Sequence, residues 1–166
     1  MTSDTSRANL RNQLYAVMDN DELAESEKQR QALSVGRTFL DVTNGHIQRQ
    51  NSDDATDEVA VSVGDDPTLL PEGATLDRST TYCRRTVESH SPIALSHASE
   101  QGWDDDPAYI EHGFECYLGT TILVEGNIYG TVCFISRQSR GKDFTPEEKL
   151  FIELMARLLG RDIEDR

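Results

Sequence analysis

The hydrophobic pattern is clearest in the second half of the chain. From Cys116 to Ser136 both alternating sets of positions are mostly apolar or small, and the polar run Glu125-Gly126-Asn127 divides them. This run has the composition of a tight turn between two strands. The pattern therefore predicts a hairpin whose strands are buried on both faces, as expected in the middle of a sheet.

The segment after this hairpin predicts a helix with a defined start. Thr145 is placed to cap it, Pro146 occupies the first helical position, and Glu148 can reach back to complete a capping box. The apolar residues that follow recur at helical spacing. We expect them to be buried, partly by the sheet and partly by the N-terminal helix of the same or a second chain. They are Phe151, Leu154, Met155, Leu158 and Leu159.

Weaker patterns organise the rest of the chain. Two helices are expected near the N-terminus, over residues 6–18 and from 21 towards 40. Further on, the sequence predicts strands at 46–51, 58–64 and 93–97, and short helices from Ser79 or Thr80 to Glu88 and at 107–112. These elements predict a central antiparallel sheet.

Five sequence blocks carry a family resemblance. They are residues 81–88 (TYCRRTVE), 103–109 (WDDDPAY), 116–120 (CYLGT), 129–134 (YGTVCF) and 144–148 (FTPEE). From about Ala32 to the C-terminus the chain resembles the GAF domain of haloarchaeal bacterio-opsin activators and sensor histidine kinases. The resemblance implies an α+β, PAS-like fold. In this fold the first and last helices lie on one face of the central antiparallel sheet, and the short helices with the loop around Trp103 form a pocket on the other. We therefore expect an N-terminal helical segment over 1–31 and a GAF domain over 32–166.

Charge narrows the classes of partner. The chain has 30 acidic and 16 Lys+Arg residues, a formal net charge of -14, and only Lys28, Lys142 and Lys149 as lysines. An acidic, lysine-poor surface suits high salt, where self-repulsion is screened, although an ordinary acidic protein is the alternative. Nucleic-acid binding is not expected, since phosphates need a cationic footprint. No stretch approaches the roughly 20 apolar residues of a membrane span. With no signal-peptide pattern at residues 1–4, a cytoplasmic location is expected.

Candidate ligand-binding residues come from segments that the implied fold brings over one sheet face. Aromatic walls with polar tips are typical of small-molecule pockets, although the same side chains can simply close a core. If the domain is a sensor, these residues should converge on one cavity. They are Tyr82, Cys83, Trp103, Tyr109, Cys116 and Tyr117. The sequence identifies neither the ligand nor a cofactor.

The cysteines raise one catalytic alternative. Free methionine-(R)-sulfoxide reductases, a branch of the same family, use pocket cysteines, and Cys83 and Cys116 would be the pair here. The context of Cys83 lacks that branch's glycines, and the segment around Cys116 also departs from it. Both are therefore expected to be small buried residues, and Cys133 to be core packing. The four histidines, His46, His90, His97 and His112, lack the spacing of a zinc site. No enzyme is indicated.

Three functions remain open at this point. The leading hypothesis is a non-catalytic sensory module that binds an unknown small molecule and relays the signal through its terminal helices, in transcriptional or histidine-kinase signalling, as a homodimer formed by those helices. The second is the reductase-like redox enzyme. The third is a dimerisation module without a ligand. A cavity beside Tyr82, Trp103 and Cys116, and the spacing of the two sulfurs, would distinguish them.

Overall fold

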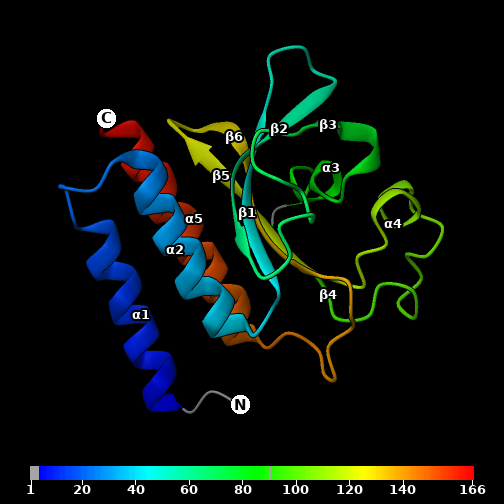
Figure 1. Cartoon of the computed structure of the whole chain (residues 1–166), viewed down its shortest axis with the longest axis horizontal. Coiled ribbons are helices and arrows are strands. Elements are labelled where there is room, and N and C mark those ends of the chain that lie inside the picture. The colour runs from blue at the N-terminus through cyan, green and yellow to red at the C-terminus, as the bar shows by residue number, and fades with distance from the viewer. Residues whose placement is uncertain (1–3, 90) are drawn as a thin grey trace.

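The computed structural model describes residues 4–89 and 91–166, and these residues form one six-stranded antiparallel sheet with helices on both faces (Figure 1). The strand order is β3-β2-β1-β6-β5-β4. The strands are β1 (Asn44–Gln50), β2 (Thr56–Gly64), β3 (Thr75–Asp77), β4 (Ile93–Leu95), β5 (Cys116–Val124) and β6 (Asn127–Ser136). The α+β architecture expected from the sequence, with a central antiparallel sheet between two sets of helices, is confirmed.

The predicted hairpin is β5 and β6, and it lies inside the sheet. β6 is paired with β5 on one side and with β1 on the other. The turn has Glu125 and Gly126 at positive φ, 52° and 81°. Glycine adopts this left-handed region without strain, which explains why the apolar run is interrupted here.

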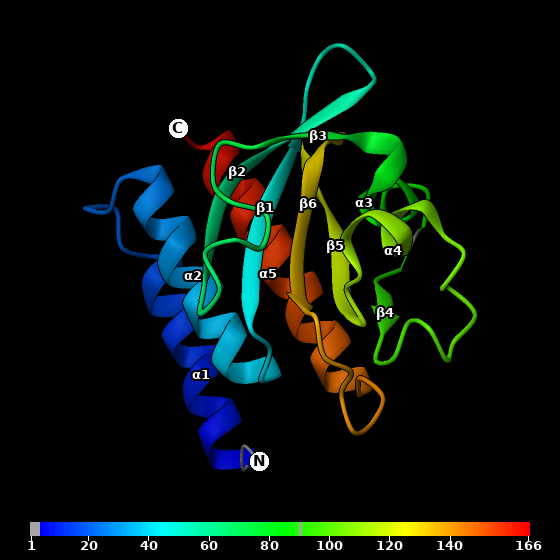
Figure 2. The same cartoon turned by 45° about the vertical axis from the view of Figure 1, so that its right-hand side comes forward.

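Three helices lie on one side of the sheet: α1 (Asp4–Met18), α2 (Glu25–Leu40) and α5 (Pro146–Glu164) (Figure 2). α2 and α5 pack on the strands, and α1 packs on α2 and α5. α2 begins four residues later than expected. The capping box of α5 is confirmed, with Thr145 and Glu148 bonding reciprocally. Phe39 of α2 stacks on Phe151 of α5, with ring centroids 3.9 Å apart.

The apolar stripe of α5 is confirmed in its centre. Phe151, Met155 and Leu159 are fully buried, while Leu154 and Leu158 are half-buried at its flank. α5 approaches β5 so closely that a side chain at Gly160 would overlap the carbonyl oxygen of Leu123. The glycine therefore sets the distance between helix and sheet.

The opposite face carries short elements only. They are the 3-10 helix η1 (Arg78–Thr80), α3 (Cys83–Thr86) and α4 (Pro107–His112). The single helix predicted from Ser79 or Thr80 to Glu88 is wrong. Asp77 caps η1 by accepting a hydrogen bond from Ser79 N, and the chain is extended at Thr81 before α3 begins. α4 is confirmed within its predicted bounds, capped by Asp106.

The sheet separates two hydrophobic cores. The core beneath the long helices includes Leu14, Leu33, Ile47, Phe134 and Met155, whereas the core beneath the short helices includes Val59, Tyr82, Tyr117, Cys133 and Ile135. None of the helices in the described part of the chain combines the length and apolar character of a membrane span.

Candidate functional site

A small cavity lies between the sheet and its cover of short elements. Its volume is about 20 Å³. A water molecule needs roughly 10–15 Å³ measured in this way, so the cavity has room for about one. Its floor is His46 and Gln48 of β1, Tyr117 of β5 and Ile135 of β6, and its cover includes Leu70, Thr81, Tyr82, Cys83, His112 and Phe114.

His46 is the most unusual side chain in this cavity. It is only 1% exposed, yet neither ring nitrogen meets hydrogen-bond geometry with a described residue. The ring lies near the Cys83 thiol, where burial raises the pKa of Cys83 and His46 works to lower it. Leaving a buried polar group unpaired costs roughly 1–3 kcal/mol. The neighbouring Gln48 is satisfied, because its Nε2 donates to Asp57 Oδ2 at 2.8 Å. His46 therefore presents its polar atoms to the cavity at a cost in stability.

His112 contributes a second ring from the cover, with a hydrogen bond to the Thr80 backbone and one unpaired nitrogen. Its Nε2 is buried without a partner among residues 4–89 and 91–166. The ring stacks on Phe114, with centroids 5.3 Å apart and planes at 10°. Burial lowers the pKa of His112, which favours the neutral ring. Two histidines, from β1 and from the end of α4, thus face the same space.

A hydroxyl and thiol network closes one side of the cavity. Tyr117 Oη lies 2.7 Å from Thr86 Oγ1, 3.3 Å from Cys133 Sγ and 3.6 Å from Cys83 Sγ. The Cys83 and Cys133 sulfurs are 3.4 Å apart. Burial raises the pKa of Tyr117 and of Cys83 well above their ordinary values. Burial also works to raise the pKa of Cys133, but hydrogen bonds with Cys83, Thr131 and Tyr117 outweigh it and lower that pKa.

Cys116 does not join this site, so the expectation that it would is wrong. Its side chain is fully buried in the core beneath the long helices, on the opposite face from Tyr117. Burial raises its pKa to about 12. The cysteine beside Cys83 is instead Cys133, which the sequence had suggested was packing alone. The thiol pair Cys83 and Cys116, on which the reductase alternative depended, is not formed.

Trp103 and Tyr109 lie at the edge of the site. The Trp103 ring meets the Tyr82 ring edge-on, with centroids 5.9 Å apart at 70°. Tyr109 Oη donates to Glu115 Oε2 at 3.3 Å. Both are partly buried against the same core but do not line the cavity. Of the six candidates, Tyr82, Cys83 and Tyr117 converge on the cavity.

Sequence reasoning missed His46 and Gln48 as site residues. The signal available was the alternation of polar residues in a predicted strand, which places both on one face. His90 lies outside the described residues. Within those residues, no three His, Cys, Asp or Glu side chains are grouped as metal ligands.

In the acidic run at 104–106, Asp106 stabilises the cover of short helices. Asp106 caps α4 and accepts a hydrogen bond from Arg84 Nη2 at 2.8 Å. Burial works to raise the pKa of Asp106, but the hydrogen bonds from Arg84 and Ala108 outweigh it and lower that pKa. This ion pair fastens α3 to α4 over the cavity.

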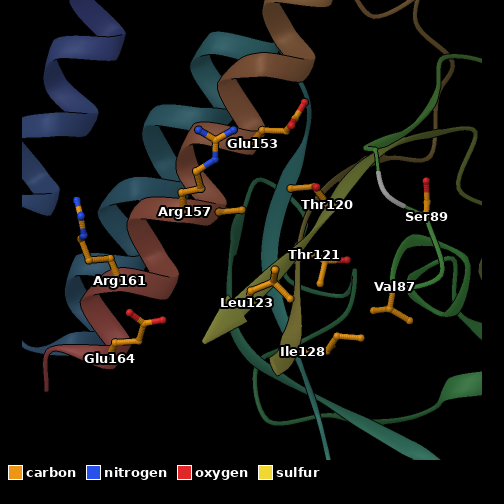
Figure 3. A pocket seen from close by; sticks show the side chains of 11 residues that line it. Val87, Ser89, Thr120, Thr121, Leu123, Ile128, Glu153, Arg157, Arg161 and Glu164 are labelled. Atoms are coloured by element: carbon orange, nitrogen blue, oxygen red, sulfur yellow. The ribbon is translucent and has the colours of Figure 1, made fainter. Parts of the chain in front are cut away.

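A second hollow is open to solvent. Figure 3 shows it between α5, which contributes Glu153 and Arg157, and β5, which contributes Thr120 and Thr121. Its volume is about 540 Å³. β4 pairs with β5 only from Tyr117 to Gly119, so the strand edge beyond it borders this hollow.

Comparison with known proteins identifies the class. The fold, with a cavity under short helices on one sheet face, is that of a GAF domain. The family model described as "GAF domain" matches residues 25–163, and the chain belongs to that family. α1 lies outside the matched range. A search of curated proteins gave no match.

Solved structures agree on the fold. The GAF domain from an Acinetobacter phosphoenolpyruvate-protein phosphotransferase superposes with a TM-score of 0.77 at 12% identity, over 99% of this chain and 96% of that chain. Free methionine-R-sulfoxide reductase from Neisseria meningitidis, solved with its substrate, gives 0.75 at 12%, over 99% and 93%. The phycocyanobilin-bound GAF domain of a cyanobacterial phytochrome gives 0.74 at 11%, over 96% and 94%.

Proposed function

We propose that this chain is a non-catalytic sensory or regulatory GAF domain whose ligand is a small molecule bound above His46. One observation carries the proposal: a histidine that is 1% exposed keeps both ring nitrogens unpaired beside a cavity. Stability alone would favour an apolar residue here. A polar group retained against stability is expected where a ligand uses it.

The site favours a ligand with a polar group that can both donate and accept hydrogen bonds. His46 offers both of its ring nitrogens and His112 offers its Nε2, and a ring nitrogen donates or accepts a hydrogen bond according to whether it carries a proton. Tyr82 and Tyr117 supply the aromatic walls. The methionine sulfoxide of the Neisseria enzyme and the bilin of the phytochrome show that structures with this fold hold small molecules.

Ligand entry requires the cover to move, because the cavity holds about one water. Leu70, which lines the cavity from the loop between β2 and β3, has a φ of 46°. An apolar residue in the left-handed region is strained by roughly 1–3 kcal/mol. Displacing Leu70 would release this strain and widen the cavity. We therefore assign the lid to residues 65–74.

β1 is suited to pass the change to the helices. His46 faces the cavity, while its neighbour Ile47 is buried in the core beneath α2 and α5. α2 ends at Leu40 and β1 begins at Asn44, so the strand and helix are directly joined. A shift of β1 by a ligand therefore acts on both sides of the sheet.

The wider context is part of the same proposal. We assign the domain to transcriptional or histidine-kinase signalling of the haloarchaeal type, acting as a homodimer through its terminal helices in high salt. Tyr15 of α1 and Leu150 of α5 support the dimer, because they are 44% and 63% exposed on the helical layer. The net charge of -14 supports the high-salt setting.

A second candidate is a dimerisation module without a ligand. The small volume of the cavity, about 20 Å³, favours it. In this alternative His46 has a single bound water as its partner. The two candidates differ in what the purified protein carries and in what His46 contributes to stability.

Native mass spectrometry of protein purified at high salt without denaturation tests the proposal. We expect a small-molecule adduct on the wild type that His46→Leu lacks and the control His97→Leu keeps, since His97 lies outside the cavity lining. Stripped of ligand, His46→Leu should be more stable than the wild type by roughly 1–3 kcal/mol, because it removes an unpaired group. A bare chain mass, with His46→Leu less stable, would support the dimerisation module instead.

A further inference from the structure

A cleft of about 730 Å³ lies at one end of the helical layer, away from the His46 cavity. It forms where α1 starts, α2 ends and α5 begins, and both cartoon views show these helix ends together (Figures 1 and 2). Four basic side chains line it: Arg7 from α1, Arg37 from α2, and Arg140 and Lys142 from the loop between β6 and α5.

Each of the three arginines in this cleft has one buried N–H donor without a partner. In the described part of the chain, Arg7 Nε, Arg37 Nε and Arg140 Nη1 make no hydrogen bond. Guanidinium groups stay charged in proteins and only donate. These three nitrogens are shielded from solvent, so they pair with an acceptor in the cleft only when the side chains turn towards it. The three arginines come from separate elements and line one cleft, and one acceptor that enters it can therefore pair with all three.

The acidic neighbours do not account for these donors. Glu148 accepts from Arg7 Nη2 at 3.3 Å and from Arg140 Nη2 at 3.0 Å, and Asp65 Oδ1 lies 2.9 Å from Arg37 Nη2. These pairs use other nitrogens. Asp41, Asp65 and Glu148 line the cleft beside the four basic residues. The cleft thus has a basic excess in a chain whose net charge is -14.

Aromatic rings orient two of the guanidinium groups. Arg7 Cζ lies 4.9 Å from the centroid of the Phe39 ring, and Arg140 Cζ lies 4.0 Å from that of Phe144. A guanidinium that stacks by its face has its N–H groups at the edge, where they can bind an oxyanion. This packing restricts the arginines before a ligand arrives.

An adjoining hollow of about 500 Å³ extends the cleft. It shares Asp41, Arg140 and Lys142 with the first, and it adds the hydroxyl residues Thr43, Ser136 and Ser139. Hydroxyl groups beside arginines match the several acceptor oxygens of a phosphate group. Together the two hollows have room for more than an inorganic ion.

We propose that this cleft binds a small oxyanion from solution, with phosphate as the chemistry that fits best, held by Arg37, Arg140 and Arg7. Because the three residues come from α2, from the loop before α5 and from α1, an anion bound here would tie the three helices together. The cleft and the His46 cavity share no lining residue, so each can be tested without the other.

Calorimetric titration with inorganic phosphate, in KCl at constant ionic strength, tests the site. We expect saturable binding to the wild type at one site. Arg37→Gln should weaken it about tenfold or more, since one hydrogen bond from a charged donor contributes roughly 1.5–3 kcal/mol. Arg157→Gln is the matched control, because it removes the same charge in the hollow beside β5 and should leave the affinity unchanged.

A second variant and two other anions complete the experiment. Lys142→Gln serves as a second cleft variant if Arg37→Gln fails to fold, since Lys142 is exposed and lines both hollows. Tighter binding of glycerol phosphate than of inorganic phosphate would assign the site to a phosphorylated small molecule, and weaker binding would assign it to the free ion. Acetate binding as well as phosphate would overturn the preference for phosphate. No saturable binding, or equal losses in Arg37→Gln and Arg157→Gln, would overturn the site.

Discussion

The carboxylate of Glu148 offers the sharpest test of the reasoning about stability. Glu148 is 0% exposed at the start of α5. It accepts a hydrogen bond from Thr145 N at 2.8 Å and pairs with Arg140 at 3.0 Å and Arg7 at 3.3 Å. It therefore joins α1, α5 and the loop before α5. Glu148→Gln keeps the size of this side chain and removes its charge.

The expected loss follows from the burial of the pair. Breaking a buried ion pair by removing one partner costs about 3–5 kcal/mol. The lower end applies, because Arg7 and Arg140 are 14% and 12% exposed and Arg7 also lies 3.8 Å from Glu147. A loss of about 3 kcal/mol lowers the melting temperature of a domain of this size by roughly 6–12 °C.

Urea denaturation in molar KCl measures this loss, with Glu147→Gln as the matched control. Glu147 precedes Glu148 on the same helix but is 45% exposed, and its partner Arg11 is 38% exposed. Exposed pairs contribute less than about 1 kcal/mol. If the two variants lose similar amounts, the buried network does not stabilise the fold as argued.

The pH dependence of the folding stability is a second test of the Glu148 ion-pair network. Burial works to raise the pKa of Glu148, but hydrogen bonds from Thr145 and Arg140 outweigh it and hold that pKa below its ordinary value of 4.5. A depressed pKa in the folded state means stability that is present above 4.5 and is lost as the pH falls through the folded value. The difference in stability between wild type and Glu148→Gln should therefore shrink as the solution becomes more acidic than pH 4.5.

Three further outcomes are expected. Gly160→Ala should destabilise the domain by roughly 1–3 kcal/mol in urea denaturation, because the added methyl overlaps the Leu123 carbonyl oxygen, whereas Gly141→Ala, with nothing near its added carbon, should be neutral. All three thiols are buried, so maleimide should label them only in denaturant, and rapid labelling of native Cys83 would contradict its burial. The melting temperature should rise from dilute buffer to molar KCl, since salt screens the charge of -14, and a flat profile would refute the high-salt interpretation.

The elements that the sequence predicted well are those with local signals. The hairpin over residues 116–136 and the capped helix from Pro146 each combine a period with a turn or cap, so their identity does not depend on the rest of the fold. The single helix predicted to Glu88 is wrong because this segment has no comparable local signal. Its apolar residues pack into the core beneath the short helices. Tertiary contacts, rather than a helical period, therefore hold the short η1 and α3 in place.

The prediction that Cys116 lines the pocket is wrong because this residue lies on the other face of the strand. Cys116 and Tyr117 are consecutive in β5, so their side chains point to opposite faces and cannot line one cavity. The run is apolar on both faces, so its hydrophobicity does not show which residues point to which face of the sheet. Strand geometry alone excludes placing both residues in the site, whereas the partner of Cys83 depends on the pairing of β5 with β6.

The same alternation explains why β1 matters more than its sequence suggests. His-Ile-Gln at 46–48 reads as a mixed strand, yet its polar side chains face the cavity and Ile47 faces the helical core. Arg37, in the last turn of α2, lines the basic cleft, and only the segment 41–43 separates α2 from β1. One continuous stretch of chain thus joins both candidate sites to the helical layer. A displacement of β1 by a ligand at His46 would reach Arg37 through a connection too short to absorb it, which is the physical basis on which a signal can leave this domain.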